Sequence, residues 1–349
     1  MIEWNNRWKE FLIGQGAVID DTGVRHFAES DTHAQHRRAA NGDIVADLSH
    51  LALIRAQGPE AAAFLQGQLS NDINGLDAGR NQLSAYCDPK GRVLALFRIF
   101  VREQAYYLQL PAALQPDTLK RLRMFVLRAK LTLDGADRDL IRIGLSGPNA
   151  QHLLAEIVPH LPAQVDESLQ HEAISVLRLA GPYARYEVVA PVETAERLWP
   201  VLGARAKTVG VSAWSWLDIA AGLPTILPGT SAEFIPQMLN LDLLNGVSFQ
   251  KGCYPGQEIV ARVQHRGRAT HRLYTAHSGI TTHPRPGDPI YDAHSDQAAG
   301  WVVDAQPAPD NGFDLSVVIP SQTPEVLRLE SRQGTPLTLQ KPAYFPAVS

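Results

Sequence analysis

The chain has 349 residues, of which 45% are hydrophobic and 19% charged, and its net charge at pH 7 is −4. This composition is typical of a folded globular protein and excludes a disordered or strongly basic chain. At this length two or three domains are expected. Because the net charge is negative, binding to nucleic acid or to an anionic membrane would require a local basic patch.

The N-terminal sequence MIEWNNRWKEFLIGQG carries early charges and no long apolar run, so a signal peptide is not expected. No segment approaches the ~20 apolar residues that cross a bilayer. Cys87 and Cys253 are too few for a disulfide framework or a four-cysteine zinc site, and the histidines lack metal-binding spacing. These features predict a cytoplasmic protein with two free thiols, no bound metal and no membrane or DNA partner.

Two stretches share one predicted order of elements. Residues 51–69 predict a strand, a Gly-Pro break and a helix, and residues 140–158 repeat that order. Each is followed by a hairpin and a second helix, at 117–130 in the first case and 192–206 in the second. Two related α+β modules follow from this pattern, and chance recurrence of a common order is the alternative. Cations in the segment 121–130 alternate with apolar residues as in a packed helix, so we assign it a structural role.

The C-terminal part has a different texture. From residue 272 onward, short strand-like runs are separated by Gly, Pro and Asp, which predicts a small β-barrel or sandwich. The segment 234–268 between the modules and this domain fits neither pattern. Connectors at domain junctions often line binding sites.

This connector contains QKGCYPGQE, which places Cys253 in an unusual setting. Phe249–Cys253 is predicted to be extended, and in an extended run Lys251 and Cys253 can point to the same side. A helix is predicted from Gln257, so its positive N-terminal end and the Lys251 ammonium would both favour the thiolate of Cys253. A small buried cysteine beside a glycine turn is the alternative, and for Cys87 that alternative is preferred.

The octapeptide KGCYPGQE at 251–258 resembles the K-G-C-[FY]-x-G-Q-E signature of the YgfZ family, folate-binding proteins related in fold to the glycine-cleavage T-protein, an aminomethyltransferase. The similarity is continuous across 234–267 and weaker over nearly the whole chain. It implies an α+β fold: a three-domain, T-protein-like cloverleaf of two antiparallel α/β modules plus a C-terminal β-barrel around a central channel for tetrahydrofolate. The implied domains comprise the following ranges: 1–50 with 140–230, 51–139 with 231–271, and 272–349.

The resemblance also implies functional residues and partners. Cys253 would be the essential residue, supported by Lys251, and the cofactor would be tetrahydrofolate or a one-carbon derivative. Residues expected to contact folate are Trp214, Asp218, Tyr254, Glu258 and Arg262. The implied partners are iron–sulfur proteins or their assembly factors, with an indirect effect on tRNA modification.

Several positions depart from the T-protein pattern. Its acidic pair falls on Leu94 and Ala95, which cannot accept a proton, so aminomethyl transfer is not expected. The glutamate expected at the pterin is Ala220, and Asp218 could replace it if that segment is extended. Leu51 replaces an aromatic residue of some family members. Trp214 is suited either to stacking on a pterin or to ordinary core packing.

Three functional hypotheses follow from these observations. The first is a tetrahydrofolate-binding accessory protein for iron–sulfur cluster assembly or repair, with a reactive Cys253. The second is a folate-dependent one-carbon transferase that uses other acids. The third is a tRNA-binding module whose contacts come from the basic segment 261–272, for which a solvated basic face is the simpler interpretation.

Overall fold

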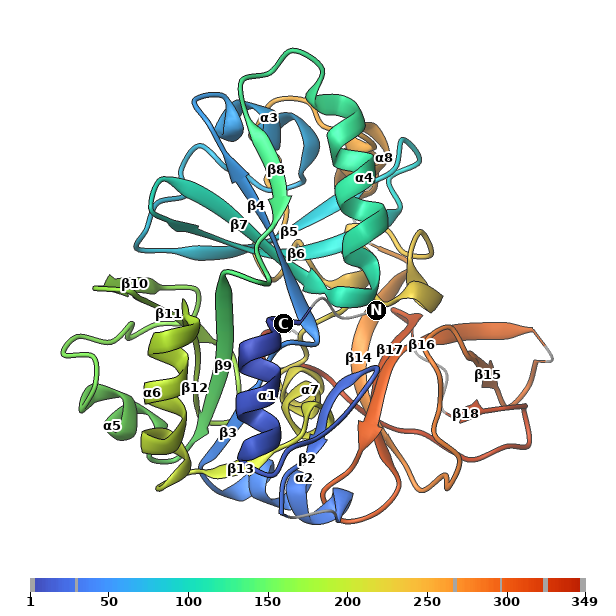
Figure 1. Ribbon diagram of the computed structural model, residues 1–349. Coiled ribbons are helices and arrows are strands. Elements are labelled where there is room, and N and C mark those ends of the chain that lie inside the picture. Colours follow the sequence, from blue (N-terminus) through green and yellow to red (C-terminus); the bar gives the residue numbers. More distant parts are fainter. Residues whose placement is uncertain (1–3, 29–30, 266–268, 296, 323–325, 346–349) are drawn as a thin grey trace. The chain divides into compact units, whose positions relative to one another are not determined.

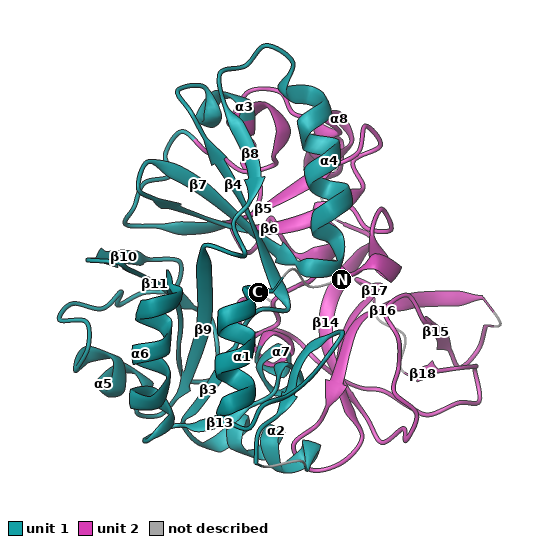
Figure 2. Cartoon of the chain, in the orientation of Figure 1, with its two compact units in different colours: residues 1–64, 74–82, 98–217 teal, residues 65–73, 83–97, 218–349 magenta. Residues whose placement is uncertain are grey.

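The computed structural model describes residues 4–28, 31–265, 269–295, 297–322 and 326–345 (Figure 1). The chain forms two compact units, shown in Figure 2. Unit 1 comprises Met1–Phe64, Asn74–Gln82 and Arg98–Leu217, and unit 2 comprises Leu65–Ile73, Leu83–Phe97 and Asp218–Ser349. The two units are therefore interleaved along the sequence.

Within the described residues the α-helices are α1 (Asn6–Gly14), α2 (Thr32–Asn41), α3 (Ala61–Gln68), α4 (Gln115–Val126), α5 (Ala150–Ala155), α6 (Val192–Gly203), α7 (Val211–Ala220) and α8 (Gln257–His265). Short 3-10 helices occupy Ala112–Leu114, Pro228–Thr230 and Pro236–Leu239. Capping explains where two helices begin, because the side chains of Asn5 and Asp31 accept hydrogen bonds from the first-turn amides of α1 and α2.

A six-stranded sheet lies wholly in unit 1. Its strands, in spatial order, are β10 (Ser168–His171), β11 (Ile174–Leu179), β12 (Ala184–Pro191), β9 (Leu140–Gly147), β3 (Ile44–Asp47) and β13 (Lys207–Val209). All neighbours are antiparallel except β13 and β3. One core packs side chains of this sheet against α1, α5 and α6, with Trp8 and Trp199 fully buried. The hairpin of β1 (Val18–Asp20) and β2 (Gly23–His26) adds Val24 to the same core.

The second module contains a five-stranded sheet. Its strands, in spatial order, are β5 (Asn81–Cys87), β6 (Val93–Arg102), β7 (Ala105–Pro111), β4 (Leu51–Gln57) and β8 (Thr132–Gly135). Residues 83–97 of the β5–β6 hairpin belong to unit 2. In unit 1, Leu53, Phe100 and Tyr107 of this sheet share a core with Leu177 and Val189 of the first sheet.

The predicted repetition of two modules is confirmed by strand order. The sequences β5-β6-β7-β4-β8 and β10-β11-β12-β9-β3 match position by position. Both Gly-Pro breaks also have the same geometry, because Gly58 and Gly147 have φ of +137° and +147°. A Cβ on Gly58 would lie 2.4 Å from the Lys130 carbonyl oxygen, and a Cβ on Gly147 would lie 2.3 Å from a side-chain oxygen of Asp43. Lys130 and Asp43 stand just before β8 and β3, so each glycine admits the chain entering the equivalent strand.

The C-terminal part of unit 2 is the predicted β-rich region. It forms a six-stranded antiparallel sheet whose strands, in spatial order, are β18 (Leu327–Leu329), β15 (Pro289–Asp292), β16 (Ala298–Pro307), β17 (Phe313–Pro320), β14 (His271–Ser278) and β19 (Thr338–Gln340). Alternate side chains form its core, among them Ile290, Val302 and Val317. The predicted three-domain boundaries stay a prediction.

Candidate functional site

The KGCYPGQE loop is packed on the turn between β5 and β6, entirely within unit 2. Gly256 has φ of +79°, and a Cβ there would lie 2.5 Å from the Asp88 carbonyl oxygen and 2.6 Å from the Gly91 Cα. Gly91 has φ of +74°, and its Cβ would meet Ile259 of α8 at 3.1 Å. The two glycines therefore allow two backbones to approach to a distance that any side chain would prevent.

Lys251 is held by main-chain groups of the segment 65–73. Its ammonium donates hydrogen bonds to the carbonyl oxygens of Leu69 (2.5 Å) and Asn71 (2.8 Å). It also lies 5.4 Å from the centre of the Tyr254 ring. Partial burial lowers the pKa of Lys251 to about 8, against the opposing effect of the Asp72 carboxylate. Lys251 therefore loses its proton at a lower pH than an ordinary surface lysine does.

The two cysteines have opposite environments. Cys253 is exposed, one residue before the buried Tyr254. Cys87 is 2% exposed, and burial, reinforced by the Asp88 carboxylate, raises its pKa to about 12. Only Cys253 is therefore accessible to a reagent or partner.

The backbone before Cys253 is not the predicted extended run. Residues 249–251 form bends and contain no strand. The expected extended run is therefore wrong, and with it the reason for placing Lys251 and Cys253 on one side, since alternation requires extended backbone. Lys251 points its amine at carbonyl groups while Cys253 is exposed. The predicted helix is confirmed, because α8 begins at Gln257.

Three further predicted folate contacts belong to the same segment. Tyr254 is buried, and burial, together with the nearby Cys87, raises the pKa of its phenol. Glu258 and Arg262 form an (i, i+4) ion pair at 2.5 Å on the exposed side of α8. Exposed pairs of this kind contribute little to stability. The contact of Tyr254, Glu258 and Arg262 with folate stays a prediction.

Asp218 lies in helical and not extended backbone, because α7 continues to Ala220. Residues two positions apart on a helix face different sides, so Asp218 cannot take the place of a glutamate at position 220 in the predicted way. It does lie near Asp304, a buried carboxyl whose pKa is raised to about 7, chiefly by burial and partly by Asp218. Both carboxyls belong to unit 2.

Trp214 of α7 is in the interior of unit 1, with 1% of its surface exposed. Its ring lies where a side chain on Gly144 would be, 2.5 Å from that ideal Cβ. The Arg185 guanidinium lies 4.2 Å from the ring centre. These contacts give the indole a core-packing role, and its stacking on a pterin stays a prediction.

A buried polar cluster beside Trp214 was not predicted. Glu187 of β12 is fully buried, and its register partner on β9 is Gly144. One Glu187 carboxylate oxygen accepts a hydrogen bond from Gln109 at 3.0 Å. Among the described residues, the other oxygen of Glu187 has no partner, and neither does Oε1 of Gln109. Burial raises the pKa of Glu187, opposed by the Gln109 hydrogen bond and nearby arginines.

Arginines lie near this carboxylate in unit 1, and two of them, Arg142 and Arg185, also lie near His50. Arg142 is 3% exposed and pairs with Asp137 at 3.1 Å, but its Nε is unpartnered among the described residues. His50 has its pKa lowered to about 3 by burial and by the charges of Arg142 and Arg185. Buried polar atoms are normally satisfied, so these unpartnered atoms are free to hydrogen-bond a water molecule or a polar ligand. Alternating charges in the apolar strand sequence ARYEVVAP were the available sequence signal.

The basic segment 261–272 divides into separate roles. Arg272 makes a bidentate pair with Asp242, at 2.5 and 2.9 Å, and is committed to structure. Arg262 pairs with Glu258, and Arg266 and Arg268 lie outside the described residues. In the part of the chain that the structure describes, no helix is long and apolar enough to span a membrane, and no group of three potential metal ligands is present.

Comparison with known proteins defines the class. The fold matches the glycine cleavage system aminomethyltransferase T from Bartonella henselae, with a TM-score of 0.75 and 16% identity, over 97% of this chain and 96% of that protein. The GCVT N-terminal domain matches residues 9–244. The molecule is therefore a mixed α/β protein with the T-protein fold.

Sequence relatives narrow the class. The tRNA-modifying protein YgfZ of Klebsiella pneumoniae (strain 342) is 34% identical over 70% of this chain and 74% of its own length. That of Photorhabdus laumondii is 32% identical over 84% of this chain and 89% of its own length. This chain belongs to the YgfZ family of GCVT-domain proteins.

Proposed function

We propose that this protein binds tetrahydrofolate and acts as an accessory factor for iron–sulfur proteins, with an indirect effect on tRNA modification. A folate-related role in tRNA modification is supported by the GCVT domain and by the similarity to the tRNA-modifying YgfZ proteins. The proposed reactivity rests on one observation: Cys253 is exposed in a loop whose close packing depends on Gly256 and Gly91.

The Cys253 loop is suited to reversible chemistry at sulfur. The thiol is accessible, whereas the neighbouring tyrosine and lysine are partly or fully covered and so hold the loop in place. Lys251, two residues from Cys253 and with its pKa lowered to about 8, would serve as a proton donor or acceptor in such a reaction once its amine leaves the Leu69 and Asn71 carbonyls. A thiol in this setting can trap an electrophilic carbon, a sulfur atom or a partner's cysteine.

The unpartnered polar atoms of the buried cluster in unit 1 support the binding of a folate heterocycle there. A pterin presents adjacent N–H donors and a carbonyl acceptor along one edge. The unpartnered Glu187 oxygen is a matching acceptor, and the unpartnered Arg142 N–H is a matching donor. When bound, tetrahydrofolate supplies a carrier for one-carbon groups. Glu187 would hold and orient its ring, and the surrounding core would exclude water.

Titration with tetrahydrofolate tests this assignment. Glu187→Gln keeps the size of the side chain but replaces an acceptor oxygen with a donor, so affinity should fall about tenfold or more. Glu193→Gln, at a carboxylate paired with Arg7 on the surface, is the matched control and should bind as wild type does. Equal affinity in wild type and Glu187→Gln would remove Glu187 from the folate site.

Complementation of a YgfZ-deficient bacterium tests the role of the thiol. Wild type should restore iron–sulfur enzyme activity and Cys253→Ala should not, although both bind folate. Steady formation of methylenetetrahydrofolate from an aminomethyl donor would instead establish the transferase alternative. Strongly salt-dependent binding of tRNA would establish the tRNA-binding alternative.

A further inference from the structure

The C-terminal half of α4 and the turn after it form an exposed surface that combines apolar and basic side chains. Met124, Phe125 and Leu127 are 61%, 49% and 87% exposed. The sequence interpretation of this segment as a packed structural helix is therefore wrong for these three residues. Their neighbours Thr118 and Leu122 supply the buried side of α4.

Leu127 ends the helix in an unfavourable backbone conformation. Its φ is +44° and its ψ is −102°, whereas the predicted helix would have continued to residue 130. A branched, non-glycine residue in this region carries strain, and such strain tends to occur at functional positions. The Leu127 side chain is also almost wholly exposed, which the hydrophobic effect alone opposes.

The same segment is strongly cationic, although the whole chain is acidic. Between residues 115 and 130 five cations, Lys120, Arg121, Arg123, Arg128 and Lys130, stand against one carboxylate, Asp117. Arg123 pairs with Asp134 at 2.9 Å. Among the described residues, Lys120, Arg121 and Arg128 have no ion-pair partner, so their charges are available to an acidic group.

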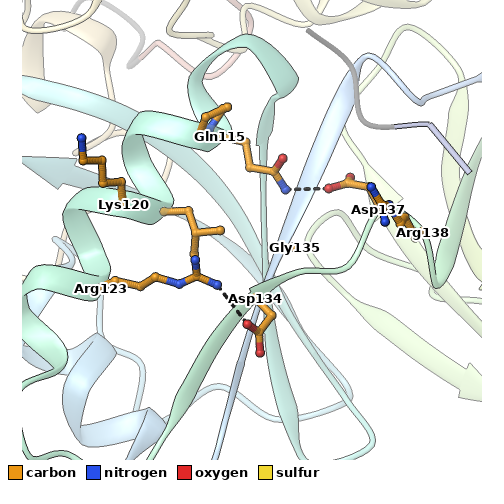
Figure 3. Close-up of a pocket in the computed structure, with 9 residues that line it drawn as sticks. Gln115, Lys120, Arg123, Asp134, Gly135, Asp137 and Arg138 are labelled. Atoms are coloured by element: carbon orange, nitrogen blue, oxygen red, sulfur yellow. Dashed lines mark hydrogen bonds and ion pairs between the residues drawn. The ribbon is translucent and has the colours of Figure 1, made fainter.

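A recess of about 630 Å³ borders this surface (Figure 3). It lies between α4 and the segment Asp134–Arg138, and Lys120 and Arg123 line its helix side. Its floor includes Asp137, which is 5% exposed and is satisfied by Gln115, Leu53 and Arg142. Lys120 lines the recess and stands one helical turn before Met124, so Lys120 and Met124 lie on the same side of α4.

We propose that this surface, formed by Lys120, Arg121, Met124, Phe125, Leu127 and Arg128 with its adjoining recess, is a docking site for an acidic, apolar-faced segment of a partner protein. Charge complementarity selects acidic side chains, and the three exposed apolar groups need an apolar counterpart. A flat lipid surface would leave the recess unfilled, and RNA phosphates would leave the aliphatic groups of Met124 and Leu127 uncovered. The proposal is independent of folate binding and of Cys253.

A binding experiment with the full chain tests the proposal. The probe is a fluorescent synthetic amphipathic helix with Leu and Phe on one face and Glu on the other. Its affinity, measured by anisotropy, should fall about tenfold or more in Lys120→Glu/Arg121→Glu and, separately, in Met124→Ser/Phe125→Ser/Leu127→Ser. The same helix with Lys in place of Glu should bind at least about tenfold more weakly to wild type.

Matched variants on the same unit control for general effects. Arg197→Glu/Lys207→Glu reverses two exposed cations elsewhere, and Ile13→Ser/Val201→Ser removes two apolar groups that are 53% and 55% exposed. Both should bind the acidic helix as wild type does, and all variants should keep the wild-type circular dichroism spectrum. Equal loss in control and test variants, or no binding of the acidic helix, would overturn the proposal. So would α4-dependent binding of phosphatidylserine vesicles or of an RNA oligonucleotide without binding of the acidic helix.

Discussion

At the residue scale, the two thiols, Cys87 and Cys253, differ in their accessibility to solvent. We expect a thiol reagent to modify one group per folded chain at neutral pH, because Cys253 is exposed whereas Cys87 is buried with its pKa raised to about 12. Unfolding should release the second thiol. Cys253→Ala should leave no fast-reacting thiol, and rapid labelling of that variant would contradict the structure.

The amine of Lys251 makes the stability of the fold depend on pH. Its pKa is about 8 in the folded protein and 10.5 when unperturbed, so the unfolded chain binds more protons between these values. The free energy of unfolding should therefore increase by on the order of 1 kcal/mol as the pH rises from about 8 to about 10.5. Urea unfolding across this range should show the gain in wild type and lose it in Lys251→Met.

At the scale of elements, the contact between the cysteine loop and the β5–β6 turn depends on the absence of a side chain at Gly256. Gly256→Ala would place a methyl group 2.5 Å from the Asp88 carbonyl oxygen at a φ of +79°. We expect a loss of roughly 2–4 kcal/mol in unfolding free energy, or local displacement of the loop.

Gly252→Ala, in the same loop, is the matched control for this substitution. No atom lies within 4 Å of an ideal Cβ at Gly252, so its effect should stay within about 1 kcal/mol. Urea unfolding compares the stabilities, and the labelling rate of Cys253 reports loop displacement. Equal behaviour of the two alanine variants would argue against the close packing of Gly256 on Gly91.

At the scale of the whole molecule, one buried carboxyl links stability to acidity. Asp304 accepts hydrogen bonds from the Ala305 amide and from Gln306, and its pKa is raised to about 7 in the folded state. Because this pKa exceeds the unfolded value, the contribution of Asp304 is greatest below pH 4 and is lost as pH rises to about 7.

Asp304→Asn should remove this part of the pH dependence. Asparagine keeps an acceptor for Ala305 and has no charge to bury, so its stability at pH 7.5 should exceed that of wild type, by at most about 4 kcal/mol. Denaturation midpoints at pH 4.5 and pH 7.5 measure the difference. If wild type and Asp304→Asn lost the same stability between pH 4.5 and pH 7.5, the pH dependence would come from another group.

The sequence by itself determined the local elements, the repetition and the family. Gly-Pro breaks at 58–59 and 147–148, periodic apolar residues and the octapeptide 251–258 are local signals, and each is matched by an element or by the comparisons. Local backbone preference and apolar periodicity suffice for such features, because neighbouring residues generate them.

Only the tertiary structure decided which side chains are exposed and which polar groups are left unpartnered. The bends before Cys253, the helical setting of Asp218, the unpartnered oxygen of Glu187 and the exposed residues at the C-terminal end of α4 are seen only in the folded chain. Lys251 shows why: its carbonyl partners, Leu69 and Asn71, lie about 180 residues away along the chain. Burial and pKa are properties of packed neighbours, and no pattern within one segment specifies those neighbours.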